Sequence, residues 1–370
     1  MSRIDDLLAD LAPEDVGFRA IGDIAQVGTG SSDRKDAADD GAYPFYVRSK
    51  NVLRIDSYEF DENAILIPGE GGIGEIFHFV SGKYALHQRA YRISFRASDI
   101  DTKYAYYYFS VHFKKYILQK AVSATVTSIR KPMITNFRIP VPPIEVQREI
   151  VGILDKFTEL EAELEAELEA RRGQYDHYRR SMLSFGSDVP WRPLGGLADN
   201  LDNMRKPVTR AARIPGEIPY YGASGVVDYV SDFIFDGDYL LVSEDGANLL
   251  ARSTPIAFSI TGKTWVNNHA HVLRFGTYAE RRFVEIYLNS IDLSPFVSGA
   301  TQPKLNKSNL TKIPVPDPSL DEKECIVAAL DNFEALVNDL SVGLPAELAA
   351  RRKQYEYYRD RLLTFEEATA

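Results

Sequence analysis

The sequence contains only one cysteine, Cys325, among its 370 residues. A single thiol excludes a disulfide framework and is typical of a protein that works in the reducing cytoplasm. No stretch approaches the roughly 18 consecutive apolar residues of a membrane-spanning helix. The first ten residues carry acids where a signal peptide needs a basic, apolar segment. We therefore expect neither secretion nor a membrane partner.

The sequence also lacks a complete motif for catalysis, a cofactor or a metal. Residues 69–74 match the Gly-x-Gly-x-x-Gly pattern of dinucleotide-binding turns, but no acid follows about 20 residues later, so we favour a tight turn after a strand. Gly262-Lys-Thr264 resembles the end of a phosphate-binding loop without its earlier glycine. His269 and His271 have no third metal ligand nearby in the sequence, and we expect them to be strand or loop side chains. The sequence predicts a non-catalytic protein with no cofactor.

The net charge of −10 does not argue against a nucleic-acid partner, because the excess of acids is confined to two segments. Residues 139–185 contain 6 basic and 10 acidic residues, and residues 313–370 contain 6 and 12. The two remaining large segments are therefore neutral. Each of them is free to present a basic face to DNA.

An internal repeat dominates the organisation of the chain. Residues 170–185 recur in similar form as residues 350–365, and Ile-Pro-Val-Pro stands at 139–142 and again at 313–316. Residues 18–22, 60–67 and 123–125 have counterparts at 191–195, 235–242 and 299–301, in the same order. Several matches in one order indicate a duplication. Residues 4–11 stand before the first copy in the place that the end of the first long helical segment occupies before the second copy. This correspondence predicts a circular, pseudo-twofold arrangement.

Each copy predicts a mixed α+β domain followed by a long helix. Short apolar runs predict strands at 64–67, 91–95 and 239–242, and helices are expected at 103–120 and 280–289. Apolar residues then recur every three or four positions in both acidic segments, as in a coiled coil, and Gly343 and Pro345 predict a break in the second. An antiparallel pair of helices would bury both apolar stripes. We predict domains at 1–140 and 186–314, followed by spacer helices at 141–185 and 315–370.

Polar and basic residues occupy loops at matching places in the two copies. Arg and Lys bind phosphates or guanine, Asn and Gln pair with adenine, and Ser and Thr contact either. Ordinary solvated loops are the alternative for any single residue. Because the framework residues match while the loop residues diverge, we predict DNA contacts at Arg34, Lys35, Arg48, Lys50, Asn51, Thr125, Thr127, Ser128, Arg130 and Lys131 in the first copy, and at Arg205, Lys206, Thr301, Gln302, Lys304, Asn306 and Lys307 in the second.

These features together resemble the specificity subunit of type I restriction-modification systems over nearly the whole chain. The resemblance is carried by the Ile-Pro-Val-Pro segments, the Gly-Ala-Thr-Gln-Pro-Lys-Leu-Asn run at 299–306 and the two Arg-Arg-x-Gln-Tyr-x-x-Tyr-Arg helix ends. The resemblance implies two target-recognition domains that read a bipartite double-stranded DNA site. It also implies that the chain is non-catalytic and that two methyltransferase subunits and the restriction subunits assemble on it. Residues 123–129 of the first copy depart from the fuller pattern.

Two other classes of function remain as alternatives. One is a nuclease or methyltransferase that acts alone, which would cut DNA or bind S-adenosylmethionine without partners. The other is a coiled-coil adaptor without sequence-specific DNA binding, which salt-sensitive binding to a particular duplex would exclude.

The best-matched residues of the duplication lie at the two helix ends. Two identical methyltransferase subunits would need two such equivalent surfaces. Packing within a helix pair is the alternative, because tyrosines at this spacing often lie in a helix seam. The candidate partner contacts are Arg171, Arg172, Tyr175, Tyr178, Arg351, Arg352, Tyr355 and Tyr358.

Residues 159–170 contain three tandem Glu-Leu-Glu-Ala tetrapeptides, and the resemblance implies a spacer element here. Removing one copy shortens a helix by about 6 Å, whereas one base pair rises about 3.4 Å. We predict that deleting residues 163–166 leaves both half-sites unchanged and shortens the unread spacer by a base pair. The methylated motif of cells carrying the deletion is the measurement. An active complex with an unchanged spacer would show that the repeat only fills the helix.

Overall fold

The computed structural model describes residues 16–120, 128–245, 248–252, 254–299, 302–339 and 341–365. The chain forms two compact units, one containing residues 1–164 and 348–370 and the other residues 165–347. Both units take part of the same long helix, α5 (Ile144–Met182). The predicted domain boundaries, which assign whole helices to spacers, remain predictions.

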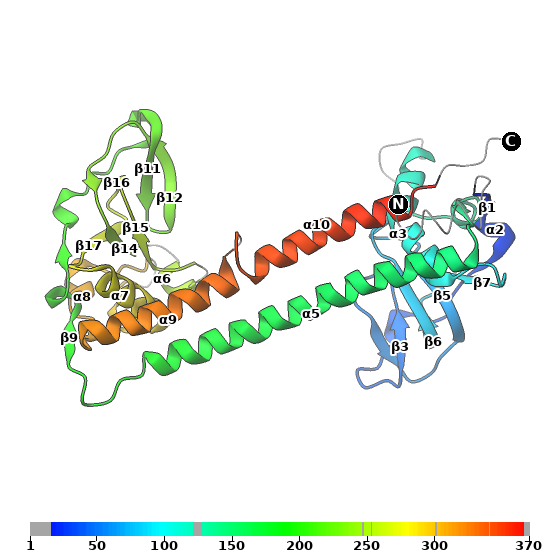
Figure 1. Ribbon diagram of the computed structural model, residues 1–370, viewed down its shortest axis with the longest axis horizontal. Coiled ribbons are helices and arrows are strands. Elements are labelled where there is room, and N and C mark those ends of the chain that lie inside the picture. The colour runs from blue at the N-terminus through cyan, green and yellow to red at the C-terminus, as the bar shows by residue number, and fades with distance from the viewer. Residues whose placement is uncertain are drawn as a thin grey trace. The chain divides into compact units, whose positions relative to one another are not determined.

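The first unit is built on a six-stranded sheet with the order β2-β7-β5-β6-β3-β4, of which β7, β5, β6 and β3 are labelled in Figure 1. Neighbouring strands are antiparallel except for β3 and β6, which are parallel. The helix α3 (Thr102–Lys120) packs on β5 and β6 and buries Tyr104, Phe109 and Phe113. The strands are β2 (Ala25–Thr29), β3 (Tyr43–Tyr46), β4 (Leu53–Ile55), β5 (Phe60–Pro68), β6 (His78–Leu86) and β7 (Ala90–Phe95).

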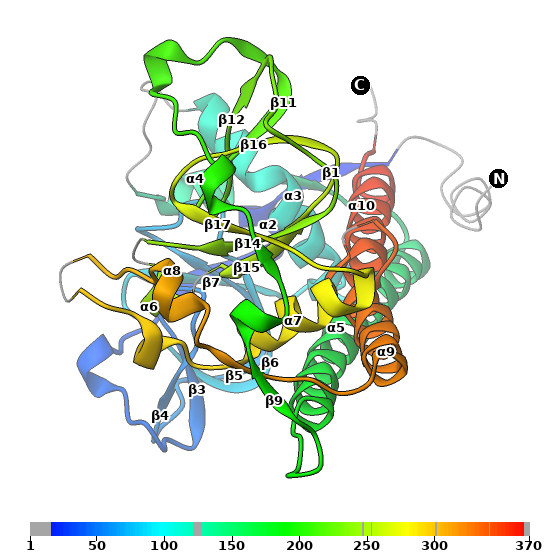
Figure 2. The same cartoon turned by 90° about the vertical axis from the view of Figure 1, so that its left-hand side faces the viewer.

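The second unit has a similar strand order divided between two four-stranded sheets, β10-β17-β14-β15 and β12-β11-β16-β13. The division occurs at Gly237 and Gly262, whose φ angles of 144° and 73° interrupt the extended backbone. The strands are β10 (Asp199–Asn200), β11 (Pro215–Gly222), β12 (Gly225–Val230), β13 (Phe235–Asp236), β14 (Tyr239–Ser243), β15 (Ala257–Ile260), β16 (Lys263–Val266) and β17 (Ala270–Arg274). The helix α7 (Tyr278–Ser290) lies against β14 and β15 (Figure 2).

A two-stranded ribbon closes the globular part of each unit. It pairs β1 (Phe18–Ala20) with β8 (Arg138–Pro140), and β9 (Trp191–Pro193) with β18 (Pro314–Pro316). The registers place Pro140 opposite Phe18 and Pro316 opposite Trp191. The two Ile-Pro-Val-Pro motifs match in the sequence, but they do not occupy equivalent positions in the two ribbons. The second motif is displaced by two residues relative to the first. The shift is tolerated because side chains alternate with a period of two, so an apolar residue stays buried in each ribbon.

The remaining helices follow the expected pattern. The predicted break near Gly343 and Pro345 separates α9 (Leu320–Asn338) from α10 (Leu344–Leu362). The helices expected at 103–120 and 280–289 and the strands expected at 91–95 and 239–242 are also confirmed, within two residues at their ends, and the strand expected at 64–67 is part of β5, which begins four residues earlier. Within the described part of the chain, no helix has the length and apolar character needed to span a membrane.

The long helical segments pack against each other within each unit. In the first unit, the ring of Phe157 on α5 lies 6.2 Å from that of Tyr355 and 5.6 Å from that of Tyr358, both on α10. In the second unit, the ring of Tyr178 on α5 lies 5.4 Å from that of Phe333 on α9. Phe157 and Phe333 therefore make equivalent ring contacts with tyrosines of the repeated helix ends, Phe157 with Tyr358 and Phe333 with Tyr178.

An aspartate ties the first part of each helical segment to the neighbouring sheet-covering helix. In the first unit, Asp155 accepts hydrogen bonds from Lys103 Nζ (2.7 Å) and from the Tyr107 hydroxyl (2.6 Å). In the second unit, Asp331 accepts them from the Tyr278 hydroxyl (2.6 Å) and Arg282 Nε (2.7 Å). The contact is retained although the two donor types have changed places.

We predict that Asp155→Ala lowers the free energy of unfolding by about 1–3 kcal/mol, because two partly buried donors lose their acceptor. Denaturant unfolding followed by circular dichroism is the measurement. Glu159→Ala, one turn further along α5, removes only an exposed pair with Lys156 and should leave the transition nearly unchanged. Equal effects of the two substitutions would contradict a stabilising role for Asp155.

Candidate nucleic-acid interface

In the first unit, the turn that ends the central strand β5 holds two other segments in place. The amide of Gly69 donates a hydrogen bond to the carbonyl of Arg89 (2.8 Å), and the carbonyl of Gly69 accepts one from the amide of Ile129 (2.8 Å). The next residue of the turn, Glu70, forms an isolated antiparallel bridge with Ser128. We call these three joined segments, residues 69–70, 87–89 and 128–131, the strand-end junction of the first unit.

The second unit repeats this junction with the same backbone contacts. The amide of Glu244 donates to the carbonyl of His269 (2.9 Å), and the carbonyl of Glu244 accepts from the amide of Leu305 (2.7 Å). Asp245 forms the antiparallel bridge with Lys304. The strand-end junction of this unit comprises residues 244–245, 267–269 and 304–307. The two junctions therefore share their backbone pairing while their side chains differ.

The glycine-rich residues 69–74 form a turn after a strand, as expected. Gly71, Gly72 and Gly74 all have positive φ angles, between 55° and 72°. Such angles favour glycine and explain the composition of the turn without a bound phosphate.

Two arginines share one carboxylate at the first junction. Arg48 Nη1 and Arg89 Nη1 both lie close to Glu70 Oε2, at 3.1 and 3.2 Å. All three side chains are at least 44% exposed, so these pairs contribute little to stability. Arg48 is one of the predicted DNA contacts, whereas Arg89 and Glu70 are not. The cluster carries one net positive charge on the surface.

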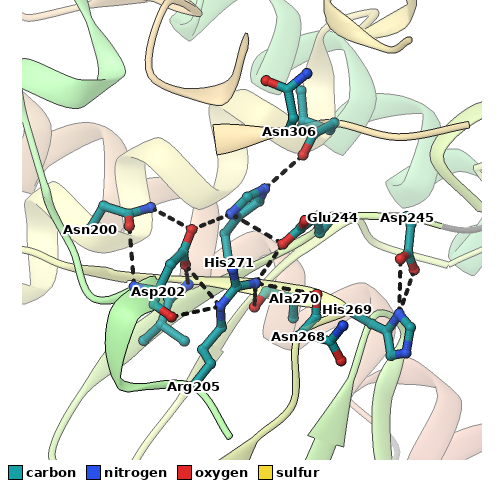
Figure 3. A network of polar contacts seen from close by, with 12 residues as sticks. Asn200, Asp202, Arg205, Glu244, Asp245, Asn268, His269, Ala270, His271 and Asn306 are labelled. Atoms are coloured by element: carbon teal, nitrogen blue, oxygen red, sulfur yellow. Dashed lines mark hydrogen bonds and ion pairs between the residues drawn. The ribbon is translucent and has the colours of Figure 1, made fainter. Parts of the chain in front are cut away.

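The second junction contains a buried polar network (Figure 3). Glu244 pairs with Arg205 Nη1 (2.6 Å) and Lys304 Nζ (3.1 Å). His271 Nδ1 lies 2.6 Å from Asp202 Oδ2, and its Nε2 lies 2.7 Å from the carbonyl of Leu305. These contacts attach the loop that contains Lys304 to the strand β17.

The network stabilises the ionised form of both acids. Burial favours the neutral form of Asp202, but hydrogen bonds from His271, the amide of Val272 and Asn200 outweigh it and lower the pKa of this carboxyl. Burial opposes ionisation of Glu244 in the same way, and Arg205 and Lys304 lower its pKa. Both acids are therefore charged structural groups at neutral pH.

The buried network changes the interpretation of Arg205. Its side chain is only 13% exposed. Besides Glu244, its guanidinium donates to the carbonyl of Ala270 (2.9 Å) and pairs with Asp202. The DNA contact predicted at Arg205 stays a prediction, and the structure shows that Nε and Nη1 of this guanidinium hold the loop to the sheet.

The two histidines are a loop and a strand side chain, as expected. The fold nevertheless brings acids to both of them, whereas the neighbouring sequence has none. Asp245 contacts His269 through both carboxylate oxygens at 2.9 Å. Among the described residues, no group of three or more His, Cys, Asp or Glu side chains is placed to hold a metal ion.

The other predicted DNA contacts have different surroundings. Asn306 caps the short helix α8 (Lys307–Leu310) by accepting a hydrogen bond from the amide of Asn309 (3.0 Å). Asn51 and Gln302 are exposed. Thr125, Thr127 and Thr301 lie outside the described residues. Among the predicted DNA contacts within the described ranges, the exposed basic side chains that form no ion pair are Arg34, Lys35, Lys50, Arg130, Lys131, Lys206 and Lys307.

The tyrosines of the repeated helix ends belong partly to the helix seams. Tyr175 is 9% exposed, and Arg179 lies over its ring at 5.4 Å. Tyr355 is half-buried, and Arg359 lies over its ring at 5.6 Å. The burial of these two tyrosines is compatible with helix packing, and their contact with a partner stays a prediction.

The outer residues of the helix ends remain accessible. Tyr178 and Tyr358 are 43% and 38% exposed. Arg171 pairs with Glu167 on its own helix, and Arg352 Nε lies 2.6 Å from Glu161 Oε1. Arg172 and Arg351 are also exposed.

Comparisons with known proteins agree with this duplicated organisation. The family described as "Type I restriction modification DNA specificity domain" matches residues 13–170 and 187–350. A putative type I restriction enzyme specificity subunit of Haemophilus influenzae is 40% identical over 186 residues, which cover 49% of this chain and 48% of that protein. The match thus spans about half the length of this relative.

Two further matches cover more of the proteins concerned. A putative type I specificity subunit of Mycoplasma pneumoniae is 30% identical over 241 residues, covering 61% of this chain and 92% of that protein. The crystal structure of the S subunit of a type I restriction-modification system from M. genitalium covers 96% of this chain and 97% of its own, with a TM-score of 0.62 and 17% identity. This last match shows a shared fold.

We predict that Glu244→Gln lowers the stability of the second unit by about 1–3 kcal/mol at pH 7, because Arg205 loses a charged partner in a largely buried position. The pKa of Glu244 is lowered by folding, so its contribution is present above the unfolded-state pKa and disappears as the pH falls through the folded-state value. The variant should therefore lose less stability than the wild type under acid conditions.

Unfolding curves measured between pH 3 and pH 7 test this prediction. Asp199→Asn is the control, since it removes an exposed pair with Arg274 on the same sheet and should change little. Parallel pH profiles for wild type and Glu244→Gln would contradict the prediction.

Proposed function

The chain belongs to the type I restriction modification DNA specificity domain family, and on that premise we propose that it selects a bipartite double-stranded DNA site with one unit for each half-site. The observation that carries this proposal is the pair of strand-end junctions. Their backbone hydrogen bonds are equivalent, but Glu70, Ser128 and Arg89 in one correspond to Asp245, Lys304 and His269 in the other. A common framework with different exposed side chains is what two readers of different sequences require.

The exposed basic residues supply the second element of DNA binding. Arg130 and Lys131 follow Ser128 in the first junction, and Lys307 closes the second. Such side chains neutralise phosphates without regard to sequence and hold a reader in register. We assign sequence-independent anchoring to these cations and to Arg34, Lys35, Lys50 and Lys206.

The helical segments suit the task of setting the distance between two half-sites. We propose that they form an antiparallel coiled-coil pair in a circular, pseudo-twofold arrangement. The equivalent contacts of Phe157 with Tyr358 and of Phe333 with Tyr178 support this arrangement, as do the matching roles of Asp155 and Asp331. Recognition modules on rigid helices can read half-sites separated by unread base pairs.

We further propose that the chain acts as a non-catalytic, cytoplasmic subunit without a cofactor, on which two methyltransferase subunits and restriction subunits assemble. A duplicated scaffold offers the same surface twice and so can bind two copies of one partner. The accessible residues Arg171, Arg172 and Tyr178, with Arg351, Arg352 and Tyr358, are the candidate contacts. The inner tyrosines Tyr175 and Tyr355 support these surfaces from the helix seams.

We predict that replacing residues 186–312 with the corresponding domain of a relative changes one half of the methylated motif and preserves the other. Methylome sequencing of cells that carry the chain with its methyltransferase is the measurement. The parental chain is the control for the original motif. A change in both halves would contradict modular reading, and the absence of a motif in the control would favour a coiled-coil adaptor.

A further inference from the structure

We propose that residues 87–89 and 267–269, which we call the two reading turns, carry specificity-determining side chains of the two half-sites. The inference rests on the proposed function and extends it to Gln88, Arg89 and Asn268, which belong to no sequence motif, and to His269, which the sequence presented only as part of an incomplete metal-ligand pair. Each reading turn places an exposed amide, Gln88 or Asn268, directly before an exposed basic side chain, Arg89 or His269.

A backbone hydrogen bond attaches the first residue of each reading turn to a neighbouring strand. His87 donates its amide hydrogen to the carbonyl of Tyr46 (2.9 Å), and Asn267 donates its own to the carbonyl of Tyr221 (3.1 Å). Both residues are buried, at 5% and 6% exposure. The amide and the basic residue that follow therefore project from a fixed base in each unit.

The buried side chain also fixes the residue two positions later. His87 Nδ1 accepts a hydrogen bond from the amide of Arg89 (3.0 Å), and Asn267 Oδ1 accepts one from the amide of His269 (2.8 Å). Burial lowers the pKa of His87 and so favours the neutral ring that can accept this bond. Two different side chains thus accept the same backbone hydrogen bond. The exposed residues of the two turns can therefore differ while the backbone contact is kept.

The chemistry at the tips matches the edges of bases. A side-chain amide can pair bidentately with adenine, and an arginine can pair bidentately with guanine. Figure 3 shows Asn268 beside His269 at the edge of the buried network. In the first unit, Gln88 donates a hydrogen bond to Asp33 (2.8 Å) across an exposed surface. Exposed contacts of this kind are weak enough to be exchanged for contacts with DNA.

A carboxylate accompanies the basic residue in both reading turns. Glu70 contacts Arg89 at 3.2 Å, and Asp245 contacts His269 at 2.9 Å. A neighbouring acid reduces the attraction of the basic side chain to any phosphate and leaves its directional hydrogen bonds to a base edge. Discrimination against unwanted partners commonly uses such opposing charges. Glu70 and Asp245 are positioning residues in this scheme, and the free cations of the junctions supply the phosphate contacts.

Methylome sequencing of the complete methyltransferase complex tests the inference. Gln88→Ala with Arg89→Ala should relax the motif in one half-site only, and Asn268→Ala with His269→Ala should relax it in the other only. The loss of discrimination between cognate and single-base-variant sites should be roughly 5- to 150-fold for a lost bidentate contact. Arg96→Ala is the matched control, because Arg96 follows the same strand β7 at its opposite end and contacts Gln26.

Binding of the purified complex to DNA supplies an independent readout. Glu70→Gln should increase affinity for unrelated duplexes and make binding more dependent on salt, since it frees two cations. A conservative double variant, Gln88→Asn with Arg89→His, copies the second reading turn into the first. It keeps the surface polar, so an effect on the motif cannot be attributed to misfolding. It should also alter the first half-site alone.

An unchanged motif and unchanged discrimination in the folded variants would overturn the inference. A uniform loss of binding to all sequences would overturn it as well, because it would assign the reading turns to phosphate contacts. If the wild-type complex produced no bipartite motif, the proposed function itself would fail.

Discussion

The strand-end junction of each unit depends on two backbone hydrogen bonds made by one residue at the end of a central strand. Gly69 and Glu244 each donate to one neighbouring segment and accept from another. A buried backbone group that loses its partner costs free energy, so these bonds hold the three segments together whatever side chains the segments carry. The surface can consequently change in sequence without a change in its scaffold.

The buried groups around the junctions show how far this separation extends. His87 and Asn267 have different chemistry but accept the same hydrogen bond from the second residue after them. In the second unit, Arg205, Glu244 and His271 form a buried polar network at the junction, whereas Glu70 of the first unit forms exposed ion pairs with Arg48 and Arg89. Equivalent geometry can therefore be supported by unlike interiors, provided that every buried polar group finds a partner.

The same principle governs the connection between the globular parts and the long helices. Asp155 and Asp331 keep their positions, while the lysine and tyrosine that serve the first are replaced by a tyrosine and an arginine at the second. A helix that supports a globular unit must hold the orientation of that unit. A carboxylate that accepts from two donors on a second helix restricts that orientation more than apolar packing alone, because hydrogen bonds are directional.

The sequence by itself determined the duplication, the helices that cover the sheets, three of the strands, the break near Gly343 and the family, because periodicity, proline and repeated motifs act locally along the chain. Only the tertiary structure decided which side chains face the surface of each junction. Arg205 is basic and lies in a loop, yet the fold buries it against Glu244, a residue 39 positions away. Arg89 belongs to no sequence motif, and the sequence places no acid beside His269, because the acid partners of both residues lie in other segments. Side chains alternate with a period of two along a strand, so the Ile-Pro-Val-Pro segments could shift against their partner strands in a way that sequence alignment does not reveal.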